Sequence, residues 1–409
     1  MSKFTIGSKI KGFEIFPPSG GGTPLDFSLQ TNGIKYYEDV TDTSTHLEIG
    51  VLDVRGRYNK LPVRSGNEMV MEIESNNEVL KQKMKISNVI GYTASAKREM
   101  YSIVCEPQSA FDNHTTRITR KYTGKISDNI KTIVEDMGGE MVKTDPTSNT
   151  YSFCGGYRRP LLACTWLAKK CIGAENEMSD TKGSAGFLFF ATQDGFTLLD
   201  INKAFDGKSK DNVVNYEYKI GKSTLDPSNY FTLSAQPIVE TNHNILQQLS
   251  VGHYKTANWY YDIITRQIKF AEYSYRDSDK EMKKSGDETI IPKGIDDKYS
   301  RILLQTVDNG VLDSKGNVES KSEESYFRQA QSTTRYSSLF SQVTKIIVPI
   351  NLKLRAGEVI YLKLPEINTT RTTGPQSGLY MISKLCHQFG GDKDYTGLEL
   401  VRDSYQELK

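Results

Sequence analysis

Residue types that build catalytic and metal sites are scarce in this chain. It has five histidines in 409 residues, and none stands at a metal-ligand spacing such as HExxH. We therefore expect no metal ion and no cofactor, and a structural or solvent-exposed role for each histidine. The five are His46, His114, His243, His253 and His387.

Cysteine is equally scarce, and no two cysteines stand at CxxC spacing. An odd, scattered set in a chain of this length is typical of reduced thiols in a cytosolic setting. Cys164 and Cys171 fall on one predicted helix and are interpreted as core residues, because free cysteine is commonly buried. The full set is Cys105, Cys154, Cys164, Cys171 and Cys386.

No catalytic residue is predicted. Cys386 precedes His387, but adjacent strand residues point to opposite faces, so the imidazole could not reach the thiol. Cys154 lies in FCGGY without an identifiable orienting partner. Acidic pairs carry no weight among 50 acidic residues, because a glycosidase needs two carboxylates at a set distance across a cleft.

Long hydrophobic runs and net charge are also missing. No stretch of about 18 apolar residues occurs, as a membrane span would need. The N-terminus, MSKFTIGSKIKGFEIF, lacks the apolar core and cleavage site of a signal peptide. Lys and Arg number 52 against 50 Asp and Glu, so we expect no stable membrane association and no general attraction for nucleic acid.

Glycine-rich and basic segments are interpreted without a specific ligand. GGG (20–22) and GSAGF (183–187) match neither phosphate-binding pattern and are interpreted as turns. The basic clusters are interpreted as a solvated or interface surface that could face a charged partner. They are Arg117, Arg120 and Lys121, and Arg158 and Arg159.

Tyrosine and phenylalanine, by contrast, are abundant, with 23 Tyr and 16 Phe beside two Trp. These residues favour β-strands, and Tyr is also enriched at protein interfaces; both interpretations remain open. Period-two alternation over 46–54, 68–74, 83–90 and 100–105 predicts a small sandwich or barrel that ends near residue 112.

The pattern then changes to that of a compact α+β domain. An apolar stripe predicts a helix over 126–137, which Gly138 and Gly139 end. A second helix is predicted from Pro160 to Gly173, with Lys169 and Lys170 in its last turn. A hairpin follows, and its Asp194-Gly195 pair is expected to supply the positive φ angles of the turn.

Strands return from Tyr216 onward. Two polar stretches within 275–325 are interpreted as surface loops. A helix is predicted over about 324–340, with one weakly apolar face. The C-terminal segment has the clearest β pattern, with strands over 344–350, 359–364 and 379–389 and a return through Leu398, Leu400 and Val401. These predict a second small barrel or sandwich. The proposed helix face consists of Tyr326, Phe327, Ala330, Thr334 and Ser337.

The order of these blocks resembles the central baseplate hub protein of contractile-tailed bacteriophages, which is related to the N-terminal part of type VI secretion spike proteins. The resemblance is carried by the helix over 126–137, by the helix–strand–turn–strand run over 160–201, and by the terminal block 344–403 with its LRAGEVIYLKL. It implies an α+β, β-rich fold with two tube-like antiparallel β-barrel domains, an inserted α+β domain and a loop-rich peripheral region.

The implied domains follow the blocks. Residues 1–112 would form the first tube-like barrel, 113–205 the α+β domain, 206–250 together with 340–405 the second barrel, and 251–339 a peripheral insertion with a helix.

The resemblance implies a structural role without enzymatic activity. Hubs of this family are trimers that adapt the sixfold tail tube to the threefold spike. The implied partners are the central spike protein, the tail tube protein and neighbouring baseplate proteins, with DNA only as cargo through the channel. The implied location is the baseplate of the virion tail, after assembly in the host cytoplasm.

Two other classes of function remain as alternatives. A tail-associated cell-wall-degrading enzyme would need a catalytic constellation, and the sequence offers none. A receptor-binding tail protein would form a trimeric fibre with long repeats, and no repeat is visible in the sequence.

Overall fold

The structure of the chain is a computed structural model. It describes residues 8–17, 23–56, 58, 63–174, 185–219, 232–280, 282–289, 291–307, 310–321, 326–365, 374–390 and 394–405. The predicted glycine turn at 20–22 and the first two residues of 183–187 lie outside these ranges.

The N-terminal block is built from strands whose buried and solvent-facing residues alternate. Every second residue of β4 and β5 is buried, which is the period that the sequence predicted. The elements are β1 (Lys9–Ile15), β2 (Leu25–Asp26), the 3-10 helix η1 (Ser28–Gln30), β3 (Thr31–Asp39), β4 (His46–Asp53), β5 (Glu68–Ser75), β6 (Glu78–Ser95) and β7 (Arg98–Glu106).

The C-terminal block combines four late strands with two strands from the middle of the chain. β13 pairs with β21, and β14 pairs with β20. The strands are β13 (Val214–Glu217), β14 (Ile238–Asn242), β20 (Gln342–Pro349), β21 (Val359–Lys363), β22 (Gly378–Phe389) and β23 (Tyr395–Arg402).

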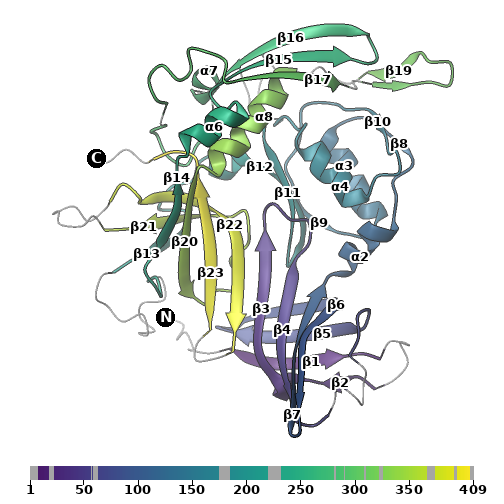
Figure 1. Cartoon of the computed structure of the whole chain (residues 1–409), viewed down its shortest axis with the longest axis vertical. Coiled ribbons are helices and arrows are strands. Elements are labelled where there is room, and N and C mark those ends of the chain that lie inside the picture. Colours follow the sequence, from purple (N-terminus) through teal and green to yellow (C-terminus); the bar gives the residue numbers. More distant parts are fainter. Residues whose placement is uncertain are drawn as a thin grey trace.

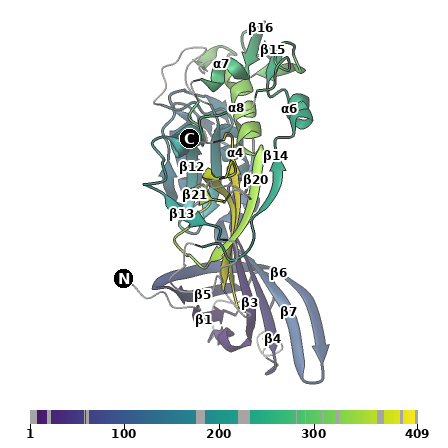
Figure 2. The ribbon, with the colours of Figure 1, turned by 90° about the vertical axis from the view of Figure 1, so that its left-hand side faces the viewer.

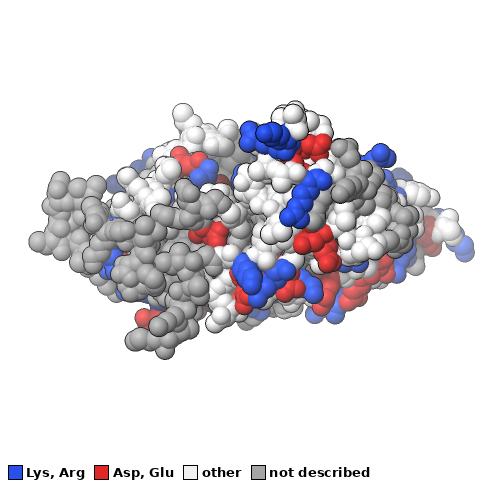
Figure 3. All heavy atoms as spheres, turned by 90° about the horizontal axis from the view of Figure 1, so that it is seen from below, with Lys and Arg blue, Asp and Glu red and all other residues white. Residues whose placement is uncertain are grey.

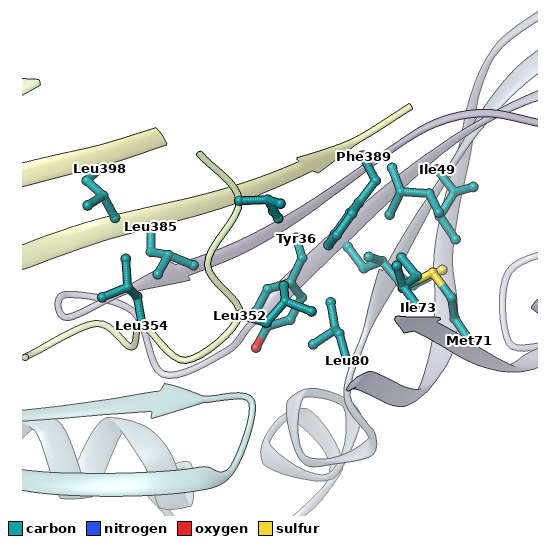
Figure 4. Packing of buried hydrophobic residues seen from close by; sticks show 14 of the residues in the cluster. Tyr36, Ile49, Met71, Ile73, Leu80, Leu352, Leu354, Leu385, Phe389 and Leu398 are labelled. Carbon is teal, nitrogen blue, oxygen red and sulfur yellow. The ribbon is translucent and has the colours of Figure 1, made fainter. Parts of the chain in front are cut away.

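The two blocks share one sheet and one core. β22 pairs antiparallel with β3, from Lys384 opposite Asp39 to Phe389 opposite Ile34. Among the described residues the sheet has 13 strands, with the main path β14-β20-β23-β22-β3-β4-β7-β6-β5-β1-β2 (Figure 1). Figure 4 shows Leu385 and Leu398 of the C-terminal block in the same apolar cluster as Ile49 and Met71 of the N-terminal block. The fold is therefore α+β and rich in β-structure, as predicted, and the strands of both blocks form one large antiparallel sheet.

An α+β unit with its own core lies between the two blocks in sequence. The buried stripe predicted for its first long helix is confirmed, and Gly138, at φ +80°, ends that helix. The elements are α2 (Gln108–Thr115), β8 (Lys121–Tyr122), α3 (Ile126–Asp136), β9 (Met141–Thr144), β10 (Phe153–Cys154), α4 (Pro160–Ala168), β11 (Phe187–Thr192), β12 (Gly195–Asp200) and α5 (Ile201–Phe205).

A third unit stands at the end of the molecule opposite β7 (Figures 1 and 2). Its sheet, β16-β15-β17, is here named the outer sheet, and helices α6 and α8 lie beneath it. The elements are α6 (Ile245–Val251), β15 (Lys255–Asp262), β16 (Gln267–Ser274), α7 (Tyr275–Asp279), β17 (Arg301–Val307), β18 (Gly310–Leu312), β19 (Val318–Lys321) and α8 (Tyr326–Leu339).

This unit corrects the prediction that the two polar stretches of 275–325 are loops. Helix α7 begins the first stretch, and β19 lies in the second. β19 forms by pairing with β18, and local polarity does not report that pairing.

The buried face of α8 also differs from the predicted one. Thr334 is buried as predicted, but Ala330 and Ser337 are only half-buried, and the side chains of Tyr326 and Phe327 lie outside the description. The helix instead buries mostly polar side chains, because the residues packed against it supply charged and hydrogen-bonding partners. The set is Arg328, Gln331, Ser332, Arg335 and Ser338.

Two local predictions in the α+β unit need correction. Helix α4 ends at Ala168 rather than at Gly173, because the Asn149 side chain forms hydrogen bonds with the backbone that follows the helix. Asn149 Nδ2 donates to Lys170 O at 2.9 Å, and its Oδ1 accepts from Ile172 N at 3.1 Å. In the hairpin, Gly195 has a positive φ of 136° and Asp194 does not, so the Asp-Gly pair supplies one such angle rather than two.

Candidate assembly interface

The described histidines lie in settings that favour a neutral, structural ring or a surface ion pair. Burial lowers the pKa of His387 and of His253 to about 3 each. His387 Nδ1 lies 2.9 Å from Thr396 Oγ1, and its ring stacks against Tyr36. His46, by contrast, is half-buried, and its hydrogen bond with the Asp42 carboxylate raises the pKa of the imidazole.

The two remaining histidines, His114 and His243, have no described acidic or nucleophilic partner in hydrogen-bond contact. His114 is exposed in the last turn of α2. His243 Nε2 lies 2.8 Å from Gln342 Nε2, and its ring packs at 5.6 Å from that of Tyr405.

The cysteines whose positions were predicted lie where the sequence placed them. Cys164 and Cys171 are fully buried in the core of the α+β unit, where burial raises the pKa of both thiols. Cys386 is partly exposed while His387 is fully buried, so the two point to opposite faces of β22. Cys154 is exposed at the end of β10. Gly155 follows it because a Cβ there would lie 2.5 Å from Ile118 O, so the glycine serves backbone packing.

The structure brings the two basic clusters together. An isolated antiparallel bridge joins Ile118 to Arg158, so the segments that carry the two clusters run side by side. Arg120 pairs with Asp136, and the Arg158 guanidinium lies 4.6 Å from the Trp166 ring centroid. Two of the five basic side chains therefore already have partners within the α+β unit.

A cavity of about 310 Å³ lies between the end of α4 and helix α8. Lys170 in its wall stacks on Tyr151 and Trp166, and Arg328 donates to Gln331 at 2.7 Å. No carboxylate is among its described lining residues. Within the described ranges, no group of three His, Cys, Asp or Glu side chains is placed to hold a metal ion. No helix in that part of the chain has the length and apolarity of a membrane span.

The two halves of the main sheet repeat one strand topology, which the sequence did not reveal. In β3-β4-β7-β6 the strands lie in the spatial order first, second, fourth, third of their chain order. The order is the same in β14-β20-β23-β22. All neighbours in both sets are antiparallel.

The repeats are joined head to tail, and the joint is made by a strand that changes partner. β22 pairs with β21 over Gly378–Met381 and with β3 over Lys384–Phe389. Its register with β23 shifts between Ile382 and Lys384, at the point of change. The third strand of one repeat, β22, thus pairs with the first strand of the next repeat, β3.

β6 has the same features in the N-terminal repeat. It pairs with β5 over Glu78–Lys85, and its register with β7 shifts between Ile86 and Asn88. Beyond that shift, residues 88–95 have no strand on the edge away from β7 among the described residues. The outer edge of β14 is likewise without a described partner strand.

Exposed apolar side chains mark both free edges. Ile238 and Val239 on β14 are 61% and 42% exposed. The β6–β7 hairpin projects from the molecule (Figure 2). Its side chains Ile90, Tyr92 and Met100 are exposed. A two-stranded ribbon is marginal in water by itself, and free edges recruit further strands.

Glu38 holds the joint between the halves to the α+β unit. Its carboxylate accepts from Gln193 N at 2.7 Å, from Ala356 N at 2.9 Å and from Tyr36 Oη at 3.1 Å. One buried side chain of β3 therefore fixes the β11–β12 turn and the turn before β21. Burial outweighs these hydrogen bonds and raises the pKa of Glu38 to about 7.

Replacing Glu38 by Gln is expected to change how stability depends on pH. Folding raises the pKa of this acid, so its contribution is full below about pH 4.5 and is lost as the pH rises towards 7. In urea titrations, the unfolding free energy of the wild type relative to Glu38→Gln should fall by roughly 2–3 kcal/mol across that window. Glu48→Gln, at a half-buried position of β4, is the control for removing a carboxylate from the same sheet without the burial of Glu38. Parallel curves for wild type and Glu38→Gln would contradict this.

A second buried charge fixes α8 and the segment 282–289 to the end of β23. Arg335 and Asp403 form an ion pair with both side chains almost fully buried. Arg335 Nη2 also donates to Lys283 O at 2.6 Å. Burial alone would raise the pKa of Asp403, but Arg335 and the hydrogen bonds from Ser285 and Ser404 hold it below its ordinary value.

The neighbouring Arg402 is held by rings and carbonyls. Its guanidinium lies between the rings of Tyr380 and Tyr405, at 4.6 and 4.7 Å. It donates to Gln342 Oε1 and to Ser377 O. These contacts fix the side chain of Arg402 at the end of β23, next to Asp403.

Charges of both signs mix on the lower face of the molecule (Figure 3). Cross-strand ion pairs of β1, β5 and β6 contribute to this, including Lys11 with Glu74 and Lys83 with Glu68. The described part of that face carries no continuous patch of one sign.

Comparison with known proteins identifies the fold. No protein-family model matches the chain, and no curated protein is similar to it in sequence. Among solved structures, a tail protein from Neisseria meningitidis MC58 is similar with a TM-score of 0.56 at 10% identity, over 97% of each chain. The 43 kDa tail protein of prophage MuSo2 from Shewanella oneidensis gives 0.54 at 11% identity, over 96% of this chain and 98% of that one.

A third similar structure is the prophage tail protein gp18 from Listeria monocytogenes EGD-e. Its TM-score is 0.50 at 9% identity, over 96% of this chain and 94% of that one. All three likenesses run over nearly the whole of both chains, so they concern the complete arrangement of units rather than one domain. The chain therefore has the fold of phage tail proteins, in agreement with its resemblance to the baseplate hub family.

Proposed function

We propose that this chain is a structural subunit of a phage tail, and more specifically a baseplate hub that assembles as a homotrimeric ring. The ring adapts a sixfold tail tube on one side to a threefold central spike on the other. Its neighbours are the tube protein, the spike protein and other baseplate proteins, and DNA passes through its channel as cargo. The coarser role, a tail component, is supported by the fold of the similar structures.

The observation that carries the hub proposal is the head-to-tail repeat in the main sheet. Each copy holds two units of the same topology, and the joint from β22 to β3 gives the rule by which one unit follows another. Applied between copies, that rule pairs the free edge of β6 at 88–95 with β14 of the next copy. Three copies then place six similar units around one axis.

This arrangement explains why the free edges persist in a single chain. A ring whose contacts are head to tail uses two different surfaces of each copy and closes without leftover edges. A closed β-ladder also resists deformation, as a conduit in a contracting tail requires. Residues 1–112, and 206–250 with 340–405, are the proposed tube-like domains, with 113–205 and 251–339 outside the ring.

Sedimentation velocity and negative-stain electron microscopy of the full chain test the proposal. We expect a trimeric mass and ring-shaped particles with six similar lobes around a channel. A stable monomer at about 10–100 μM, where typical specific interfaces are well populated, would contradict the ring. A monomer that also degrades purified cell wall would replace the hub by the enzymatic alternative.

A further inference from the structure

The face of the outer sheet that points away from α6 and α8 is apolar and open to water. Strand register places Phe270, Trp259 and Leu304 side by side in one row across the three strands. The next row holds Ile268 beside Tyr261, and Ile302 lies on the other side of the central row. Together with Ile263 these residues are 38–79% exposed.

The other face of the sheet is buried along its central strand, β15. Asn258 and Tyr260 alternate there with the exposed Trp259 and Tyr261 and are each 1% exposed. The sheet therefore has one covered layer and one uncovered layer, although its uncovered side chains are the more hydrophobic. Such a face costs solubility unless something covers it.

Charge is absent from the centre of this face. The charged side chains in its rows, Glu272 and Lys255, lie at one end and pair with each other at 3.0 Å. Tyr299 adds a 2.6 Å hydrogen bond to Glu272 at the same end. A surface that meets a copy of itself would therefore oppose no like charges at its centre.

The size of the face fits a contact between two copies. Seven side chains of this size and exposure leave on the order of 700 Å² of apolar surface in water, above the patch size typical of monomers. Two such faces in contact would bury roughly twice that area, within the range of stable specific interfaces. Apolar sheet faces pack on each other in this way in β-sandwiches.

We propose that the outer sheet is a self-association surface, on which the face centred on Trp259 and Leu304 packs against the same face of a second copy. The contact is twofold and uses none of the edges assigned to the ring, since β6 and β14 belong to the main sheet. It is therefore independent of the hub proposal. Two rings, or two single chains if no ring forms, associate through this face.

Sedimentation velocity over a concentration series tests the contact. We expect the wild-type mass to double with rising concentration. Leu304→Glu should weaken the doubling by at least tenfold in Kd, roughly the effect of a disrupted central contact. Leu246→Glu is the matched control, because Leu246 on α6 is also 79% exposed but lies off the face. It should leave the doubling unchanged.

Fluorescence gives a second readout at the site itself. In a Trp166→Phe background, Trp259 is the sole tryptophan, and its emission should move to shorter wavelength as the doubled species forms. A mass that never doubles up to about 100 μM would overturn the proposal. Equal effects of Leu304→Glu and Leu246→Glu would overturn it too. A variant that disrupts the ring at β14 but still doubles would separate this contact from the ring.

Discussion

Replacing Arg335 by Met is expected to cost about 3–5 kcal/mol of unfolding free energy near neutral pH, because it leaves a buried carboxylate without its partner. Asp403 has no exposed surface, and its remaining partners, Ser285 and Ser404, are neutral donors. The loss should appear in urea unfolding followed by circular dichroism. The loss should be most severe for the third unit, the one with the outer sheet, because Arg335 attaches its helix α8 to the end of β23.

The dependence on pH distinguishes this effect from simple loss of packing. Asp403 has a lowered pKa in the native protein, so it stabilises the fold above its unfolded pKa, and this contribution is lost as the pH falls through the folded value. In Arg335→Met the buried carboxyl gains by protonation instead. The deficit relative to wild type should therefore shrink as the pH falls towards 4.

Arg276→Met is the control for the buried pair. Arg276 pairs with Asp296 and is half-exposed, so its removal should cost much less than the loss of Arg335. If both variants lose similar amounts, the buried pair contributes no more than a surface contact.

Replacing Val239 by Lys should dissociate the proposed trimer. Val239 lies on the free edge strand β14 and is 42% exposed in the single chain. A charge placed there opposes strand addition by the β6 edge of a neighbouring copy. We expect the dissociation constant of the ring to rise at least tenfold, measured by sedimentation equilibrium, while the chain stays folded. Ile90→Lys on the opposite edge should have the same effect.

Val142→Lys provides the comparison. Val142 is an exposed valine on β9, also an edge strand, but in the small sheet of the α+β unit. Its replacement should leave the trimer intact. A trimer that survives Val239→Lys and Ile90→Lys unchanged would show that the ring closes elsewhere.

Local pattern predicted those elements whose burial follows their own sequence period. The alternation in β4 and β5 and the stripe of α3 each carry their burial in neighbouring residues, so strands and helix were found close to their bounds. The core roles of Cys164 and Cys171 followed for the same reason.

Elements stabilised by distant partners escaped prediction. The buried face of α8 is polar because Asp403, nearly 70 residues away, supplies a countercharge to Arg335. Asn149 shortened α4 through hydrogen bonds that no helical pattern contains. The polar stretches of 275–325 include β19 because β18 lies beside it.

The candidate interfaces divide in the same way. Composition and local pattern together indicated a β-rich chain with balanced charge, few thiols and no sequence pattern of a catalytic site. Only the tertiary structure placed β22 beside β3, showed the repeated topology and left the edges of β6 and β14 free. Strand pairing is set by hydrogen bonds between backbones far apart in sequence, and backbone groups are nearly the same in every residue, so side-chain patterns carry little information about which strands meet.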